Sequence, residues 1–186
     1  NYIDEEAMRS TLYLETLFDD INGEVYKEIG PFKIYVERTV GGRYRYLPRI
    51  DIQYIPLLPY LRSIYQRHPT KEDMEEIGGD ITFQKMYRVI KNRVSNEIRE
   101  IDGLNLMEED IDKLSELMFW EILGLTRLAP FLLDDEIEEA FIDGMKSPIY
   151  INHRRYGRCE SDIILRRGEA EALITHIELH KGISIN

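Results

Sequence analysis

The side chains best suited to chemistry are the few histidines. His176 and His180 lie four residues apart on a predicted helix, with Glu178 between them. That spacing puts two imidazoles on one helix face, where they could bind a metal ion. Two ligands make only half of a tetrahedral site, however, and the order H-E-x-x-H is absent. A partly exposed helix face is the simpler interpretation, so we predict no metal site.

The carboxylates and the single cysteine also have structural explanations. The acidic run DDEIEE at 134–139 resembles the paired carboxylates of general acid–base catalysis. Acidic residues are equally typical of a helix N-terminus, which is the interpretation we favour. Cys159 alternates with Glu160 on a predicted strand and is expected to be buried filler. His153, beside Arg154 in a predicted turn, is expected to make a loop contact, and we predict no catalytic residue.

Glycine-rich loops that cradle phosphate are absent from the sequence. Neither G-x-x-x-x-G-K-[ST] nor G-x-G-x-x-G occurs, and the glycine pairs at 41–42 and 78–79 lack the lysine and the strand-to-helix context. The G-x-S-x-G elbow is missing as well. We therefore expect these residues alone to hold no cofactor and to show no ATP turnover.

Charge is distributed in blocks along the sequence. The net charge is −11 at pH 7, yet only residues 1–30 and 71–143 are acidic on balance, while 31–70 and 144–186 are basic. Such alternation suggests separate surfaces for separate partners, and ordinary solvated faces are the alternative. We predict that an interface to a partner or a neighbouring subunit uses these residues: Arg154, Arg155, Arg158, Arg166, Arg167, Glu108, Glu109, Asp110 and Asp112.

Nucleic acid is a disfavoured partner. Binding would have to use the basic stretch Arg43, Arg45 and Arg49, with Tyr44 and Tyr46 as stacking faces. The acidic bulk of the chain opposes this interaction, so we predict no nucleic-acid partner.

Cysteine content and hydropathy favour a cytoplasmic location. Cys159 is the only cysteine, which excludes an intramolecular disulfide. No apolar run approaches the roughly 20 residues that span a bilayer.

These residues are positioned by a predicted α+β fold with two units. Alternation of period two from Phe32 to Tyr54 around Gly41-Gly42 predicts a β-hairpin, with Pro48 at an edge or a bulge. Helical spacing and caps predict helices over 4–20, 56–68, 70–78, 80–102 and 108–123. We expect a helical subdomain with this hairpin over 1–125.

The second predicted unit spans 131–186. Short apolar runs predict strands at 140–142, 148–152 and 159–165, and a helix follows Gly168. This order is the opening half of a small α+β subdomain.

Several segments of this second unit resemble a known family. They are LDDEIEE at 133–139, IDG at 142–144, PIYI at 148–151, HRRYG at 153–157 and the final ISIN at 183–186. They are similar to the N-terminal domain of archaeal type II/type IV secretion ATPases, the GspE-like proteins, which power secretion, type IV pili and the archaellum. The resemblance is strongest over about residues 120–186.

The resemblance implies the non-motor N-terminal region of a hexameric ATPase, peripheral at the cytoplasmic face of the cell membrane. In that family a C-terminal RecA-like motor, absent from these residues, binds ATP and Mg²⁺. Implied partners are the protein's own motor domain, neighbouring subunits and a polytopic membrane platform protein. Cytoplasmic loops of membrane proteins are rich in Lys and Arg, which an acidic block at 71–143 would match. A stand-alone interaction adaptor and a small-molecule sensor are the alternatives.

Overall fold

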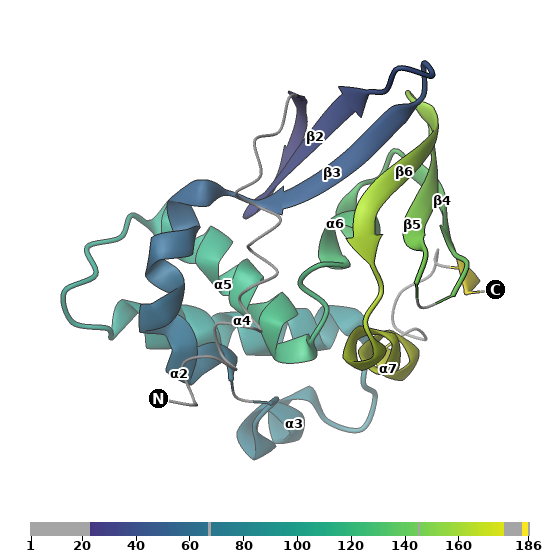
Figure 1. The fold of residues 1–186 in the computed structure, drawn as a ribbon. Helices are drawn as coiled ribbons and strands as arrows, with labels where there is room; N and C mark the ends of the chain where they lie inside the picture. Colours follow the sequence, from purple (N-terminus) through teal and green to yellow (C-terminus); the bar gives the residue numbers. More distant parts are fainter. Residues whose placement is uncertain (1–22, 67, 145, 177–183, 186) are drawn as a thin grey trace.

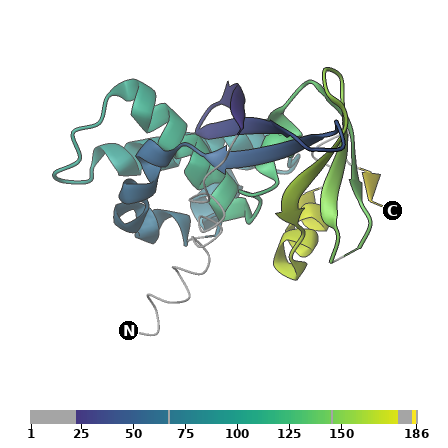
Figure 2. The same cartoon turned by 45° about the horizontal axis from the view of Figure 1, so that its top comes forward.

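The structure, a computed structural model, describes residues 23–66, 68–144, 146–176 and 184–185. They form an α+β protein, which confirms the predicted fold class (Figure 1). Both views show the helices of the first half of the chain toward one end of the molecule and the strands of its last third toward the other, with the last helix beside them (Figures 1 and 2). The predicted helix over 4–20 lies outside the described residues.

The first three strands form an antiparallel meander. β1 (Glu24–Ile29) pairs with β2 (Phe32–Arg38), and β2 pairs with β3 (Tyr44–Ile50) through the turn at Gly41-Gly42. The alternation of Phe32, Ile34 and Val36 places these side chains in the core. The predicted hairpin is therefore confirmed, whereas β1 was not predicted.

The predicted continuation of the strand to Tyr54 is wrong. Residues Ile52–Leu61 form the 3-10 helix η2, which Asp51 caps by accepting a hydrogen bond from the Gln53 backbone nitrogen at 3.2 Å. Two prolines inside η2 limit the hydrogen bonds available to an α-helix. α2 (Arg62–Tyr65) follows directly.

The next three helices begin and end close to where the sequence predicts. α3 (Lys71–Ile77) begins with a capping box between Thr70 and Asp73. α4 (Phe83–Arg99) packs its apolar stripe against α5 (Glu108–Leu123), whose first turn is acidic, as the helix dipole favours. Gly124 closes α5 in the left-handed conformation, with φ of 73°.

The second half of the chain completes the sheet. Its elements are α6 (Ala129–Leu133), β4 (Ile137–Ile142), β5 (Pro148–His153), β6 (Gly157–Ile164), α7 (Arg167–His176) and β7 (Ser184–Ile185). The helix N-terminus predicted within 134–139 is wrong, because Asp134 follows the end of α6 and the run continues as β4. The helix predicted after Gly168 is α7, on which Leu173 is buried and Ile174 is exposed.

One sheet joins the two halves of the chain. Its strand order is β1-β2-β3-β6-β5-β4-β7, and the central pair β3–β6 is parallel from Tyr44↔Cys159 to Tyr46↔Ser161. Beyond that point the two strands diverge (Figure 1), and Pro48 lies in the diverging part, where β6 has no residue in register with it. The division at residues 125–131 stays a prediction, but the sheet is continuous across it.

Candidate functional site

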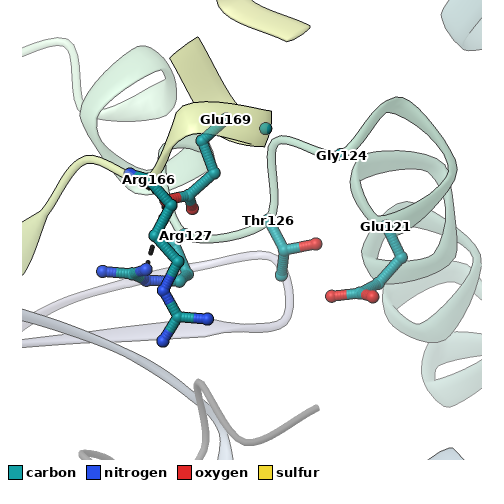
Figure 3. Close-up of a pocket in the computed structure, with 7 residues that line it drawn as sticks. Glu121, Gly124, Thr126, Arg127, Arg166 and Glu169 are labelled. Carbon is teal, nitrogen blue, oxygen red and sulfur yellow. Dashed lines mark hydrogen bonds and ion pairs between the residues drawn. The ribbon is translucent and has the colours of Figure 1, made fainter. Parts of the chain in front are cut away.

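A cleft opens where the C-terminal end of α5 faces the first turn of α7 (Figure 3). It consists of two hollows of about 410 and 440 Å³, both lined by Glu121, Gly124 and Gly168. Volumes of this size accommodate a small ligand or a single long side chain. Sequence reasoning did not predict this cleft.

The end of α5 shapes one wall of the cleft. The Gly124 nitrogen donates to the Glu121 carbonyl at 3.0 Å, and the Leu125 nitrogen donates to the Trp120 carbonyl at 2.9 Å, which closes the last turn. A Cβ on Gly124 would lie 3.6 Å from the Cβ of Ala172, so α7 passes close to this turn.

Glu169 organises the opposite wall. Its Oε1 accepts hydrogen bonds from Arg127 Nη1 at 3.1 Å and from the Arg166 backbone nitrogen at 2.9 Å. Arg127 Nη2 also donates to the Ile164 carbonyl at 2.9 Å. Glu169 is 5% exposed. Its charge is thus used inside the protein, where it caps α7 and ties the loop after α5 to the end of β6.

Glu121 is the unusual group of the cleft. Its side chain is half-buried, and Figure 3 shows its carboxylate directed toward Thr126. Burial raises the pKa of Glu121 to about 7, a hydrogen bond with Thr126 acts in the opposite direction, and the charge of Glu169 raises it further. The carboxyl group can therefore bind a cation, and its charge changes near neutral pH.

The five predicted interface arginines occupy two places. Arg154, Arg155 and Arg158 surround the turn between β5 and β6, whereas Arg166 and Arg167 begin α7. Only Arg166 lines the cleft. The partners of the others are Glu138 at 3.9 Å for Arg154, Glu136 at 3.3 Å for Arg155, the rings of Phe141 and Tyr150 for Arg158, and Glu171 at 3.4 Å for Arg167.

The predicted acidic interface residues all lie on the first turns of α5. Each has a partner within the chain: Glu108 pairs with Arg99 at 2.8 Å, Glu109 with Lys113 at 3.2 Å and Asp112 with Lys91 at 2.7 Å, and Asp110 accepts from the Tyr54 hydroxyl at 3.2 Å. Exposed ion pairs of this kind contribute little stability, so a partner protein could replace them. An interface here stays a prediction.

His153 makes the predicted contact with its turn, and it also belongs to a buried polar cluster that was not predicted. It is 3% exposed and lies edge-on to the ring of Tyr26, with Asp134 Oδ2 3.5 Å from its Nε2. Nitrogen and oxygen atoms of Asp134, Glu136 and His153 lie within 4.8 Å of one another, as three metal ligands would. The burial of His153 could have been predicted from the alternation of residues along β5, because Ile149, Ile151 and His153 point to the same face of the sheet.

The hydrogen bonds of His153 do not suit a metal ion. Its Nδ1 accepts from the backbone nitrogens of Arg155 and Tyr156 at 3.1 and 3.4 Å, so the proton of the neutral ring resides on Nε2. Burial lowers the pKa of His153, which favours this neutral form. A metal on Nε2 would require an imidazolate, and Lys27 Nζ already lies 3.4 Å from Asp134 and from Glu136. The cluster is better explained as the polar link between β1, β5 and the end of α6.

Two further predictions meet the structure only in part. The side chains of His176 and His180 lie outside the described residues. In the stretch proposed as the alternative nucleic-acid surface, Tyr46 and Arg49 are buried, and Arg49 is bonded to Asp162 on β6.

Among the described helices, none has the length and apolar character needed to cross a membrane.

Comparison with known proteins gives one relative and no family. No protein-family model matches the chain. The chain is 34% identical over 147 residues to the uncharacterized protein MJ0781 of the archaeon Methanocaldococcus jannaschii. The match covers 78% of this chain and 19% of that protein, so the chain corresponds to only a minor part of a much longer relative.

Proposed function

We propose that this chain is the non-motor N-terminal region of a hexameric secretion or type IV pilus assembly ATPase, which positions the motor and docks to a membrane platform protein. The observation that carries the proposal is the fold of the segment that resembles the family. Residues 133–144 and 146–157 run from the end of α6 through the antiparallel pair β4–β5 to the turn before β6. Asp134 and His153, both within that segment, lie together at its buried centre.

The relative supports the proposal through its source and its length. It is an archaeal protein, and the matched region is 19% of its sequence. A much longer chain leaves room for a separate motor domain, to which ATP and Mg²⁺ binding would belong.

The continuous sheet supports a mechanical role. The parallel β3–β6 pair joins the β1–β3 meander to the C-terminal strands, and the Arg49–Asp162 ion pair bridges the same two strands where they diverge. A region that transmits a movement from a motor must respond as one body, and main-chain pairing across the middle of the chain provides that stiffness.

The experiment compares the 186-residue chain with the protein translated from the whole gene. We expect no ATP hydrolysis from the chain alone, and hydrolysis by a ring-forming assembly from the whole protein, measured by phosphate release and light scattering. A whole protein without hydrolysis or without a motor domain would favour the stand-alone adaptor instead.

Charge reversal tests the predicted subunit contact in the whole protein. Arg154→Glu combined with Arg158→Glu is expected to weaken ring formation, because both side chains surround the same turn. Arg43→Glu, on the exposed turn of the β2–β3 hairpin, is the matched control and should leave the ring intact. Equal loss in all variants would contradict a specific contact.

A further inference from the structure

We propose that the cleft between α5 and α7 binds a lysine or arginine side chain from a cytoplasmic loop of the membrane platform protein, with Glu121 as its anionic partner. The chemistry of the bound side chain follows from the cleft itself. The choice of the platform loop as its source rests on the proposed function.

The shape of the larger hollow fits a long side chain with a charged end. Tyr65, Ile122, Leu123 and Ala172 provide apolar walls, and Glu121 provides an acidic group among them. Lysine and arginine place an aliphatic stem along apolar surface and keep the cationic group at a polar partner. A volume of about 440 Å³ is ample for one such side chain.

The charges around the cleft leave Glu121 as the acid that needs a cation. Glu169 is paired with Arg127 at 3.1 Å, and Glu171 is paired with Arg167 at 3.4 Å. In the part of the chain that the structure describes, Glu121 has Thr126 as a hydrogen-bond partner but no ion-pair partner. A carboxylate held among protein atoms without a counter-charge is costly, and a docked ammonium or guanidinium group would remove that cost.

An anionic ligand fits the cleft less well. The first turn of α7 would be its natural position, but the carboxylate of Glu169 already accepts from the Arg166 nitrogen there. Arg127 on the same wall is bonded to Glu169 and to the Ile164 carbonyl. A phosphate or carboxylate would have to displace Glu169 from its buried position.

The character of the whole chain agrees with a basic partner. Its net charge is −11, and cytoplasmic loops of membrane proteins carry an excess of lysine and arginine. Long-range attraction would bring such a loop to the surface, and the cleft would then hold one of its side chains.

The test uses two peptides that differ only in the ammonium group. One is an acetylated and amidated heptapeptide with three central lysines, and the other has norleucine at those three positions. Each is titrated into the ¹⁵N-labelled 186-residue chain at pH 7.5 and about 0.15 M salt. We expect the lysine peptide to bind at least tenfold more tightly and to shift the amide signals of Gly124 and Gly168.

A matched pair of variants assigns the binding to the cleft. Glu121→Gln keeps the size of the side chain and is expected to weaken lysine-peptide binding at least tenfold. Glu116→Gln changes another enclosed acid on α5, which lies against Gly30 and outside the cleft, and should leave the affinity unchanged. The ¹⁵N spectra of both variants verify that they are folded.

The outcomes separate this proposal from the proposed function. Equal binding of the norleucine peptide, or full affinity in Glu121→Gln, would overturn the cleft assignment whatever the whole protein does. Lysine-specific binding that needs Glu121, together with a whole protein that lacks ATPase activity, would support the cleft while refuting the proposed function and with it the platform loop as the source.

Discussion

The replacement Glu121→Gln should stabilise the protein at neutral and alkaline pH. Enclosure within the protein raises the pKa of Glu121 from 4.5 to about 7. Between these two values the folded protein retains a proton that the unfolded chain has already released. By linkage, the free energy of unfolding must therefore decrease as the pH rises from about 4.5 to 7, and the penalty is complete above 7. A glutamine at this position has no ionisable proton, so the variant does not suffer this penalty.

The size of the effect follows from the shift. A change of about 2.5 pKa units corresponds to about 3 kcal/mol at most, since one unit is ~1.36 kcal/mol. Glu121 is only half-buried and reaches solvent through the cleft, and water there screens part of the penalty. We expect a difference of about 1–2 kcal/mol between the variant and the wild-type protein at pH 8, falling toward zero at pH 5.

Urea unfolding measures this difference through the fluorescence of Trp120, the only tryptophan and fully buried. Wild-type protein, Glu121→Gln and the control Glu76→Gln, which alters an exposed side chain of α3, are compared at pH 5, 6, 7 and 8. The neighbouring Glu169, whose pKa burial also raises, is present in all three proteins, and its effect largely cancels in the comparison. A difference that does not change with pH, or a variant less stable than the wild type at pH 8, would refute the reasoning.

Four other results are expected. Asp134→Ala should reduce the free energy of unfolding by about 3 kcal/mol, because it leaves buried donors without an acceptor, as urea unfolding would measure. Added ZnCl₂ should raise the melting temperature of the wild-type protein no more than that of His153→Ala. A rise in the wild-type protein alone would contradict the assignment of the His153 proton to Nε2. Arg49→Leu should cost about 3 kcal/mol, and Arg49→Leu with Asp162→Leu distinctly less, because the double variant leaves no unpaired buried charge. Gly124→Ala should cost about 1 kcal/mol in thermal unfolding, because its φ of 73° is unfavourable for any side chain.

Features that depend on a few neighbouring residues were predictable from the sequence. Thr70 and Asp73 form their capping box within four residues, and Gly124 ends α5 because it alone tolerates the left-handed conformation. The β2–β3 hairpin is equally local, since its turn and its alternation lie within one short stretch. In each case the decisive contacts are close in the sequence.

Features that depend on distant partners were not predictable in the same way. β1 has the sequence EVYKEI, which carries no clear alternation, and it becomes a strand by pairing with β2. Asp134 stands in a run that suits a helix N-terminus, yet the Tyr46 hydroxyl, 88 residues away in sequence, donates to it at 2.8 Å. The parallel β3–β6 pair likewise joins segments separated by five α-helices and the 3-10 helix η2 of the described chain.

Glu121 could have been noticed in the sequence. It stands within the apolar run LMFWEIL and in the last turn of a helix, where the negative end of the helix dipole disfavours an acid. Three of the other acidic residues on α5, Glu108, Glu109 and Asp110, lie in its first turn, where the dipole stabilises them. A glutamate at the wrong end of an otherwise well-ordered helix is a local conflict, and such conflicts often mark functional positions.

The effects of Glu121→Gln on stability and on peptide affinity, taken together, show whether Glu121 serves the fold or binds a ligand. If Glu121 served only the fold, its replacement would weaken the protein and would alter peptide binding only through that loss. A binding acid behaves in the opposite way: without a bound cation it destabilises the folded chain, and its replacement strengthens the fold while it removes the affinity. The lysine peptide should accordingly stabilise the wild-type protein against urea at pH 8 and leave the stability of Glu121→Gln unchanged. Stabilisation of both proteins to the same extent would place the peptide elsewhere on the surface.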